Sequence, residues 1–148
     1  MVPRLDFLDL KRQDRAALHA LKAAAKEVGF LTVYNTGISR EDVLRLLDVY
    51  KAFFKGPNAE KQAVNGANRG WCPPGAEQVS ADANPDYKEV FDCGIALAES
   101  DRLCALGVYA PNQWPKNLAM FDVDIMAYFE RARYILDYFA SYCGGEWA

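Results

Sequence analysis

The residues best suited to bind a ligand lie in the stretch NRGWCPPGAEQ, residues 68–78. Arg69 carries a planar guanidinium whose five N–H donors suit a carboxylate, and Trp71 offers a large apolar face with one donor. Pro73 and Pro74 fix the backbone φ of the turn that follows, which would hold both side chains in place. This pattern predicts a clamp for an anionic or amphipathic small molecule.

A structural role also explains the same residues, and composition alone favours it. In this interpretation Trp71 packs on the domain's own core, and Arg69 pairs with Glu77 or Asp82. The same choice between ligand binding and structure applies to two residues further along the chain, Lys88 and Glu89. The residue types alone leave both interpretations open.

The sequence contains one histidine, His19. At helical spacing it shares a face with Arg15, Lys22 and Lys26, so we expect a solvated surface residue. A Ser-His-Asp triad would have to use this same histidine, and the G-x-S-x-G sequence that usually carries the serine is absent. We therefore predict neither a catalytic residue nor a metal ligand in this chain.

Composition limits the class of protein. The 148 residues are 51% hydrophobic, which is enough to fill a core without disulfides or a metal. The net charge of −3 disfavours a nucleic-acid partner or a polybasic membrane patch. No signal peptide and no apolar run of about 18 residues is present, so we expect a soluble, cytoplasmic protein. Its scattered cysteines, Cys72, Cys93, Cys104 and Cys143, favour reduced thiols over a zinc or disulfide framework.

Hydrophobic periodicity predicts strands that alternate with helices, an order that ordinarily suggests a parallel α/β sheet, but the strands are few. The predicted elements are a strand over 5–10, a helix over 13–28 closed by Gly29, a strand over 30–35, a helix over 39–54, a short helix over 58–64, a strand over 87–97 and a long helix over 117–142. The helix at 39–54 opens on a capping-box-like SRED, and Asn58 is the expected cap of the short helix. Residues 66–85 are rich in Gly, Pro, Asn and Asp and predict a long loop. No glycine-rich phosphate loop follows the first strand, which disfavours a nucleotide fold.

Six segments follow one another along the chain: VPRLDFLDL, AAKEVGFLTVYNTGIS, AFFKGPNAEKQ, NRGWCPPGAEQ, PDYKEVFDCG and PNQWP. In this order they resemble the N-terminal region of the non-haem Fe(II), 2-oxoglutarate-dependent dioxygenases related to isopenicillin N synthase. The chain differs from the usual pattern at Thr36, where family members usually carry a histidine that is not a metal ligand. The resemblance runs nearly end to end and assigns residues 1–148 to a dioxygenase N-terminal-like domain.

The resemblance implies an α+β fold, in which a helix-rich region with three to four helices and a few short strands packs against a double-stranded β-helix. In the family that barrel holds iron through an H-x-D…H triad and 2-oxoglutarate through an R-x-S motif. Neither motif follows in this chain. We therefore expect Fe(II) and 2-oxoglutarate in the complete enzyme, no cofactor bound to this chain alone, and no activity by itself.

The resemblance also places NRGW beside the mouth of the barrel, which makes Arg69 and Trp71 candidate substrate-binding residues and Lys88, Glu89 and Phe91 weaker ones. Two hypotheses follow: a truncated enzyme whose missing barrel completes a small-molecule site, or a stand-alone, non-catalytic binding module. In either case we expect the apolar stripe between residues 118 and 139 and the strand edge at 5–10 to be exposed, and self-association to cover them.

Overall fold

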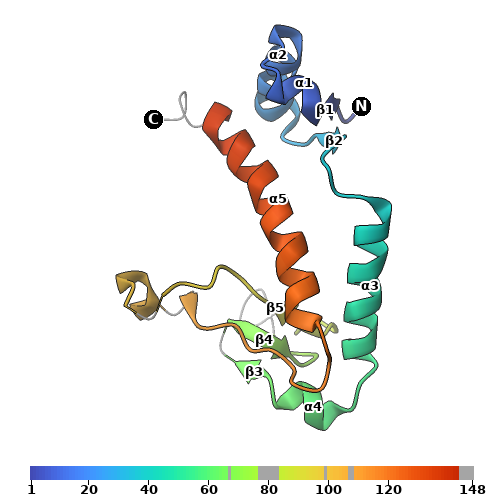
Figure 1. The fold of residues 1–148 in the computed structure, drawn as a ribbon, viewed down its shortest axis with the longest axis vertical. Coiled ribbons are helices and arrows are strands. Elements are labelled where there is room, and N and C mark those ends of the chain that lie inside the picture. Colours follow the sequence, from blue (N-terminus) through green and yellow to red (C-terminus); the bar gives the residue numbers. More distant parts are fainter. Residues whose placement is uncertain (67, 77–83, 99, 107–108, 144–148) are drawn as a thin grey trace. The chain divides into compact units, whose positions relative to one another are not determined.

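The computed structural model describes residues 1–66, 68–76, 84–98, 100–106 and 109–143 (Figure 1). The chain divides into two compact units, Met1–Leu44 with Ala127–Ala148, and Arg45–Met126. Both unit boundaries fall inside long helices, α3 (Arg40–Phe54) and α5 (Phe121–Cys143). The predicted α+β class is confirmed.

The first unit begins with β1 (Arg4–Asp6), which pairs in parallel with β2 (Thr32–Tyr34). The strand predicted over 5–10 is wrong beyond Asp6, because α1 (Phe7–Lys11) starts there. The Asp6 carboxylate accepts a hydrogen bond from Leu8 N at 2.8 Å and caps the new helix. Phe7 and Leu10 are therefore buried at helical spacing, three residues apart on α1.

The second helix, α2 (Arg15–Ala23), begins after Asp14, whose side chain accepts a hydrogen bond from Ala17 N. It continues into the π-helical turn η1 (Ala24–Val28) and ends at Gly29, whose φ of 75° confirms the predicted C-cap. A π turn holds more residues than an α turn, which rotates the residues after it about the helix axis. Val28, the last residue of η1, is 43% exposed.

The core of the first unit contradicts the expected exposure of residues 5–10. Leu5, Phe7 and Leu10 are 7%, 2% and 0% exposed. They pack with residues of α2 and of the C-terminal part of α5, Leu21 and Ile135. The expectation failed because this segment's own unit supplies the covering helices. The expected exposure of the apolar stripe at 118–139 is also wrong at Phe121, Ile125 and Ile135, which are 1%, 3% and 8% exposed.

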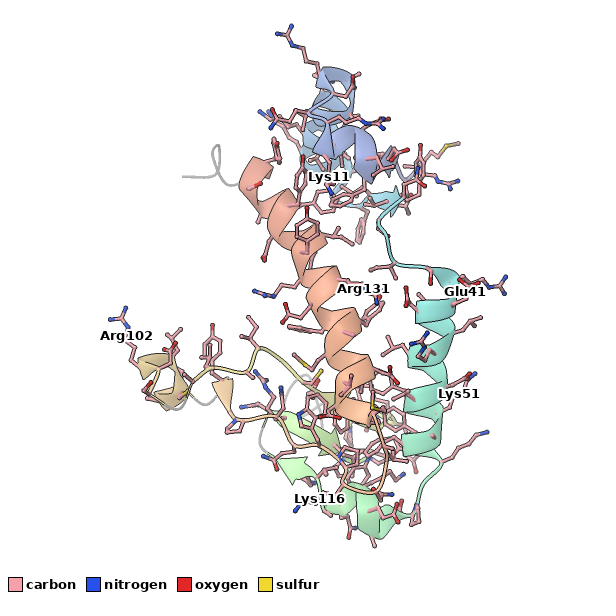
Figure 2. The ribbon with its side chains drawn as sticks, viewed as in Figure 1. Lys11, Glu41, Lys51, Arg102, Lys116 and Arg131 are labelled. Carbon is pink, nitrogen blue, oxygen red and sulfur yellow. The ribbon has the colours of Figure 1, made fainter. Side chains whose placement is uncertain are left out.

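Aromatic contacts complete this core. The ring of Phe7 meets Tyr138 edge to face, with centroids 5.3 Å apart, and the Tyr138 hydroxyl donates a hydrogen bond to Leu10 O. Burial raises the pKa of Tyr138 to about 12. At the rim, the Lys11 ammonium lies 5.7 Å from the centroid of the Tyr134 ring (Figure 2).

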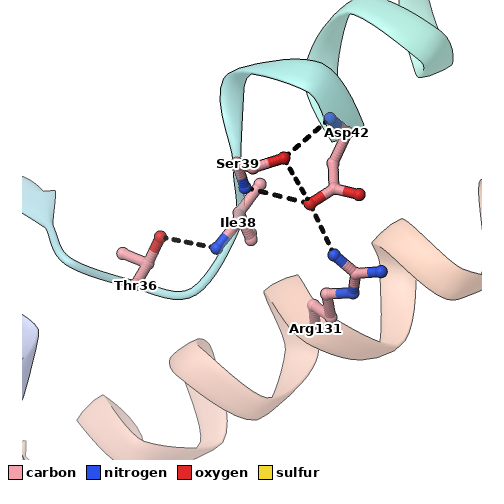
Figure 3. A network of polar contacts seen from close by, with 5 residues as sticks. All are labelled: Thr36, Ile38, Ser39, Asp42 and Arg131. Atoms are coloured by element: carbon pink, nitrogen blue, oxygen red, sulfur yellow. Dashed lines mark hydrogen bonds and ion pairs between the residues drawn. The ribbon is translucent and has the colours of Figure 1, made fainter.

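The start of α3 forms the predicted capping box (Figure 3). Asp42 N donates to Ser39 Oγ, and Ser39 N donates back to the Asp42 carboxylate, both at 3.0 Å. Arg131 of α5 donates to the same carboxylate at 2.6 Å. The Ser39 backbone N–H, then its hydroxyl and then Arg131 hold the pKa of Asp42 below its ordinary value. Thr36 Oγ1 accepts a hydrogen bond from Ile38 N in the preceding turn.

The second unit contains α4 (Asn58–Gln62) and an antiparallel sheet of β3 (Asn65–Gly66), β4 (Arg69–Cys72) and β5 (Val90–Asp92). Asn58 is the first residue of α4 and not its cap; Pro57 takes that position without a side-chain bond. The loop predicted over 66–85 is wrong at β4, and the strand predicted over 87–97 is limited to β5. A short 3-10 helix, η2 (Arg102–Ala105), follows.

The core of the second unit is mainly aromatic. Its buried members are Phe53, Val64, Trp71, Phe91, Phe121 and Ile125, contributed by α3, the residues after α4, the sheet and α5. The centroid of the Phe91 ring lies 4.9 Å from that of Phe53 and 5.1 Å from that of Phe121, and both pairs meet edge to face. The sheet is thus fixed to helices at both ends of the unit's sequence. Among the described residues, no helix has the length and apolarity that crossing a membrane requires.

Candidate functional site

The structure brings the predicted site residues onto one small sheet. Arg69 and Trp71 belong to β4, and Phe91 belongs to β5, where it lies directly opposite Trp71. Lys88 and Glu89 immediately precede β5. Residues about 20 positions apart in sequence are therefore neighbours because of the strand pairing.

Trp71 packs in the core of the second unit, as the structural interpretation predicted. Its side chain belongs to the buried cluster, and the residue is only 4% exposed. Phe91 is 9% exposed and stacks on Trp114, with ring centroids 5.9 Å apart. Direct contact of Trp71 and Phe91 with a substrate remains a prediction.

Glu89 accepts two hydrogen bonds on the same carboxylate oxygen. Trp71 Nε1 donates to Glu89 Oε2 at 2.7 Å, and Lys61 Nζ donates to it at 2.8 Å. The Lys61 ammonium, opposed in part by burial, holds the pKa of Glu89 below its ordinary value, and the Trp71 indole N–H adds to this effect. Sequence analysis missed Lys61, which lies in a polar segment that reads as a solvated surface.

Arg69 lies across the backbone of Gly94. A Cβ atom at Gly94 would come within 2.6 Å of Arg69 Nη2, so any larger residue there would displace the guanidinium. The Asn112 side chain fixes Gly94, because its amide donates to Gly94 O at 2.8 Å and accepts from Gly94 N at 2.9 Å. Arg69 also donates to Asn68 O at 2.7 Å. The predicted partners Glu77 and Asp82 lie outside the described residues.

Two further titratable groups lie near Arg69. Burial raises the pKa of the Cys93 thiol, while the Arg69 charge lowers it in part. Burial, followed by the adjacent Cys93, raises the pKa of Tyr50 to about 12. Both groups are therefore neutral at physiological pH, and Arg69 supplies positive charge to this part of the sheet.

The backbone of β4 depends on Gly70. Its φ is +83°, and a Cβ atom there would lie 1.9 Å from Val64 O, the acceptor of a hydrogen bond from Trp71 N. The glycine in RGW therefore permits the close approach of β4 to the end of α4. Gly70 is therefore the residue in the sequence that could have indicated a strand in close backbone contact, where a loop was predicted.

Lys88 differs from the other predicted residues in being exposed. Its ammonium pairs with Asp86 at 3.0 Å, and its side chain is 54% exposed. The preceding Tyr87 is 99% exposed. This segment therefore presents a charged and an aromatic side chain to solvent.

A groove of about 370 Å³ opens at another place in the second unit. Its lining includes Glu60, Trp114 and Lys116, the last labelled in Figure 2, and includes none of the five predicted site residues. Asn117 donates a hydrogen bond to Glu60 within it. The groove adjoins the predicted site through Trp114, which stacks on Phe91, and through Val64, whose carbonyl oxygen accepts a hydrogen bond from Trp71 N.

The residues of this chain do not fit an iron site of the facial-triad type. That site takes two histidines and one carboxylate. The sequence supplies one histidine, and His19 is exposed on α2 as predicted. Across the part of the chain that the structure describes, no three His, Cys, Asp or Glu residues are grouped so as to hold a metal ion.

Comparison with known sequences identifies relatives of known class. The chain is 35% identical over 121 residues to azadirone synthase LFS of Melia azedarach, a match that covers 77% of this chain and 36% of that protein. It is 32% identical over 123 residues to the 2-oxoglutarate-dependent dioxygenase frbJ of Dothideomycetidae sp. strain 11243, covering 77% and 33%. The matches thus span about a third of each of these relatives.

Solved structures share the fold. A 2OG-Fe(II) oxygenase family protein from Caulobacter crescentus superposes with a TM-score of 0.77 at 24% identity, covering 95% of this chain and 48% of that one. A full-length Neurospora crassa protein, solved in complex with alpha-KG, gives 0.70 at 24% identity, covering 97% and 47%. The sequence pattern of the family described as non-haem dioxygenase in morphine synthesis N-terminal matches residues 2–117. The chain therefore belongs to this non-haem dioxygenase N-terminal family.

Proposed function

We propose that this chain is the N-terminal part of a 2-oxoglutarate/Fe(II)-dependent oxygenase, that it shapes the substrate pocket, and that it is not competent alone. The observation that carries the proposal is the family match over residues 2–117, together with relatives of which the chain spans only about a third. The remaining part of such an enzyme would hold both Fe(II) and 2-oxoglutarate. The donor set described above supports this division, because one histidine cannot complete a facial triad.

Within this proposal the five predicted residues have different tasks. Arg69 and Lys88 offer cationic groups to a small-molecule substrate. Trp71, Phe91 and Glu89 shape the pocket from behind, because their side chains fix the sheet that carries Arg69. The expected partner of the chain is the catalytic barrel, and Leu136 on α5, which is 65% exposed, is a candidate contact for it.

A second candidate function is a stand-alone binding module without catalytic activity. One observation favours it: residues 5–10, expected to need an outside partner, are buried within the chain's own first unit. A module that works alone must bury its hydrophobic core within its own chain. The reading frame downstream of codon 148 distinguishes the candidates, because an H-x-D…H sequence supports the enzyme and an immediate stop codon supports the module.

The direct test of the metal prediction is an anaerobic Fe(II) titration of the purified 148-residue chain by calorimetry, with 2-oxoglutarate present and absent. We expect no stoichiometric, high-affinity site under either condition. His19→Ala is the matched control and should give the same titration, because the histidine is exposed. A site of one iron per chain would contradict the proposal that the metal belongs to another part of the enzyme.

A further inference from the structure

The second unit contains a buried cation that the proposed function does not use. Lys61, near the end of α4, is 6% exposed and is the buried charged residue of the described chain. Its ammonium contacts Glu89 Oε2 at 2.8 Å and Phe54 O at 3.3 Å, and it lies 5.3 Å from the centroid of the Trp71 ring. An ammonium this far from water is costly unless its partners are held in place.

These contacts converge from four parts of the unit. Phe54 ends α3, Lys61 belongs to α4, Trp71 belongs to β4, and Glu89 leads into β5. Because Trp71 Nε1 donates to the oxygen that also accepts from Lys61, a single carboxylate oxygen fixes both the lysine and the indole. Trp71 is two residues from Arg69 on the same strand, so a shift of the strand backbone at Trp71 would also move Arg69.

We propose that Lys61 and Glu89 are a pair of positioning residues that fix β4, and through it Arg69, and that Glu89 does not itself bind substrate. The proposal rests on the proposed function only in taking Arg69 as a pocket residue. Glu89 was a candidate substrate contact from sequence. In the structure, one oxygen of its carboxylate accepts hydrogen bonds from two side chains of this chain, Trp71 and Lys61. The Lys61 ammonium that the carboxylate neutralises is buried. Loss of Glu89 would leave that cation without its counter-charge.

The test uses the 148-residue chain and three variants: Glu89→Gln, the double variant Glu89→Gln with Lys61→Met, and the control Lys88→Met. Glutamine keeps an acceptor for the Trp71 indole but removes the charge, and methionine removes the cation at similar size. The first measurement is amide hydrogen exchange of Gly70, Trp71 and Cys72. The second follows the Cys93 thiol pKa through its ¹³Cβ chemical shift, because Arg69 is one of the charges that set it.

We expect exchange in β4 to be about tenfold faster or more in Glu89→Gln, and within about threefold of wild type in the double variant. The Cys93 pKa should rise in Glu89→Gln, as Arg69 moves away, and return in the double variant. The control should change neither. The proposal would be overturned if Glu89→Gln left either the amide exchange rate of β4 or the Cys93 pKa unchanged. It would also be overturned if the amides of β4 exchanged as fast in the double variant as in Glu89→Gln. Neither measurement needs iron or turnover, so a result against the positioning role of Lys61 and Glu89 is distinct from a result against the proposed function.

Discussion

The two units of this chain stabilise themselves in different ways. The first buries an apolar core of Leu5, Phe7, Leu10, Leu21 and Ile135, and its Asp42–Arg131 ion pair lies at the surface. The second buries a mainly aromatic core and, beside it, the charged Lys61. The difference is that the second unit holds a buried charge paired with a carboxylate, Lys61 with Glu89, and this unit also carries all five predicted site residues.

The largest effect should come from Gly70→Ala in the second unit. The new Cβ would overlap Val64 O at 1.9 Å and would sit on a residue with φ of +83°. We expect a loss of about 4 kcal/mol or more of unfolding free energy, measured by urea denaturation. Gly37→Ala in the first unit is the control, because its φ is +81° but nothing lies within 4 Å. It should cost only about 1 kcal/mol. Equal losses would refute the close approach of β4 to Val64.

Leu10→Ala in the first unit should have the next largest effect. Leu10 is 0% exposed, so the substitution leaves a cavity and should cost about 3 kcal/mol by denaturant unfolding. Leu8→Ala on the same short helix is the control, because Leu8 is 43% exposed and should change stability by at most about 0.5 kcal/mol. Similar small effects at both positions would restore the original expectation that this segment is exposed.

Ser39→Ala tests the cap of α3 and should cost about 1 kcal/mol. The hydroxyl accepts a hydrogen bond from Asp42 N at 3.0 Å, and alanine leaves that donor to water. Thermal unfolding by circular dichroism would measure the change. Ser39→Asp, which restores an acceptor, should recover most of the loss; a Ser39→Ala variant as stable as wild type would contradict the cap.

The smallest effect should come from Arg131→Gln, because the ion pair with Asp42 is exposed. The pKa of Asp42 is lower in the folded state than its ordinary value of 3.8. The ionised carboxylate therefore stabilises the folded state above pH 3.8, and this stabilisation is lost as the pH falls through the lower, folded-state pKa. Arg131→Gln should raise that pKa, as followed by the NMR titration of the carboxyl carbon. Arg133→Gln, which removes a pair with Glu130, should leave Asp42 unchanged. No shift in Arg131→Gln would remove Arg131 from the network.

Sequence patterns predicted the elements whose signals are local. The C-cap at Gly29 and the Ser39–Asp42 capping box depend on adjacent residues, and both were found. The strand over 5–10 failed because Asp6 can end a strand and cap a helix equally well. The alternation of apolar residues did not decide between these outcomes.

Sequence reasoning predicted that the segments of the candidate site lie close together, but it did not predict their contacts. Arg69, Trp71 and Phe91 do lie together on β4 and β5. No local pattern pairs Lys61 with Glu89, 28 residues away, because only the formation of the sheet brings them together. Charge is therefore a weak guide to exposure wherever a tertiary partner neutralises it.

We propose that the reacting centre lies outside these 148 residues, and turnover of 2-oxoglutarate tests this most directly. The purified chain would be incubated with Fe(II), ascorbate, oxygen and 2-oxoglutarate, and succinate would be measured against a protein-free control. We predict succinate no higher than in that control. Succinate formed over many turnovers per chain would contradict the account.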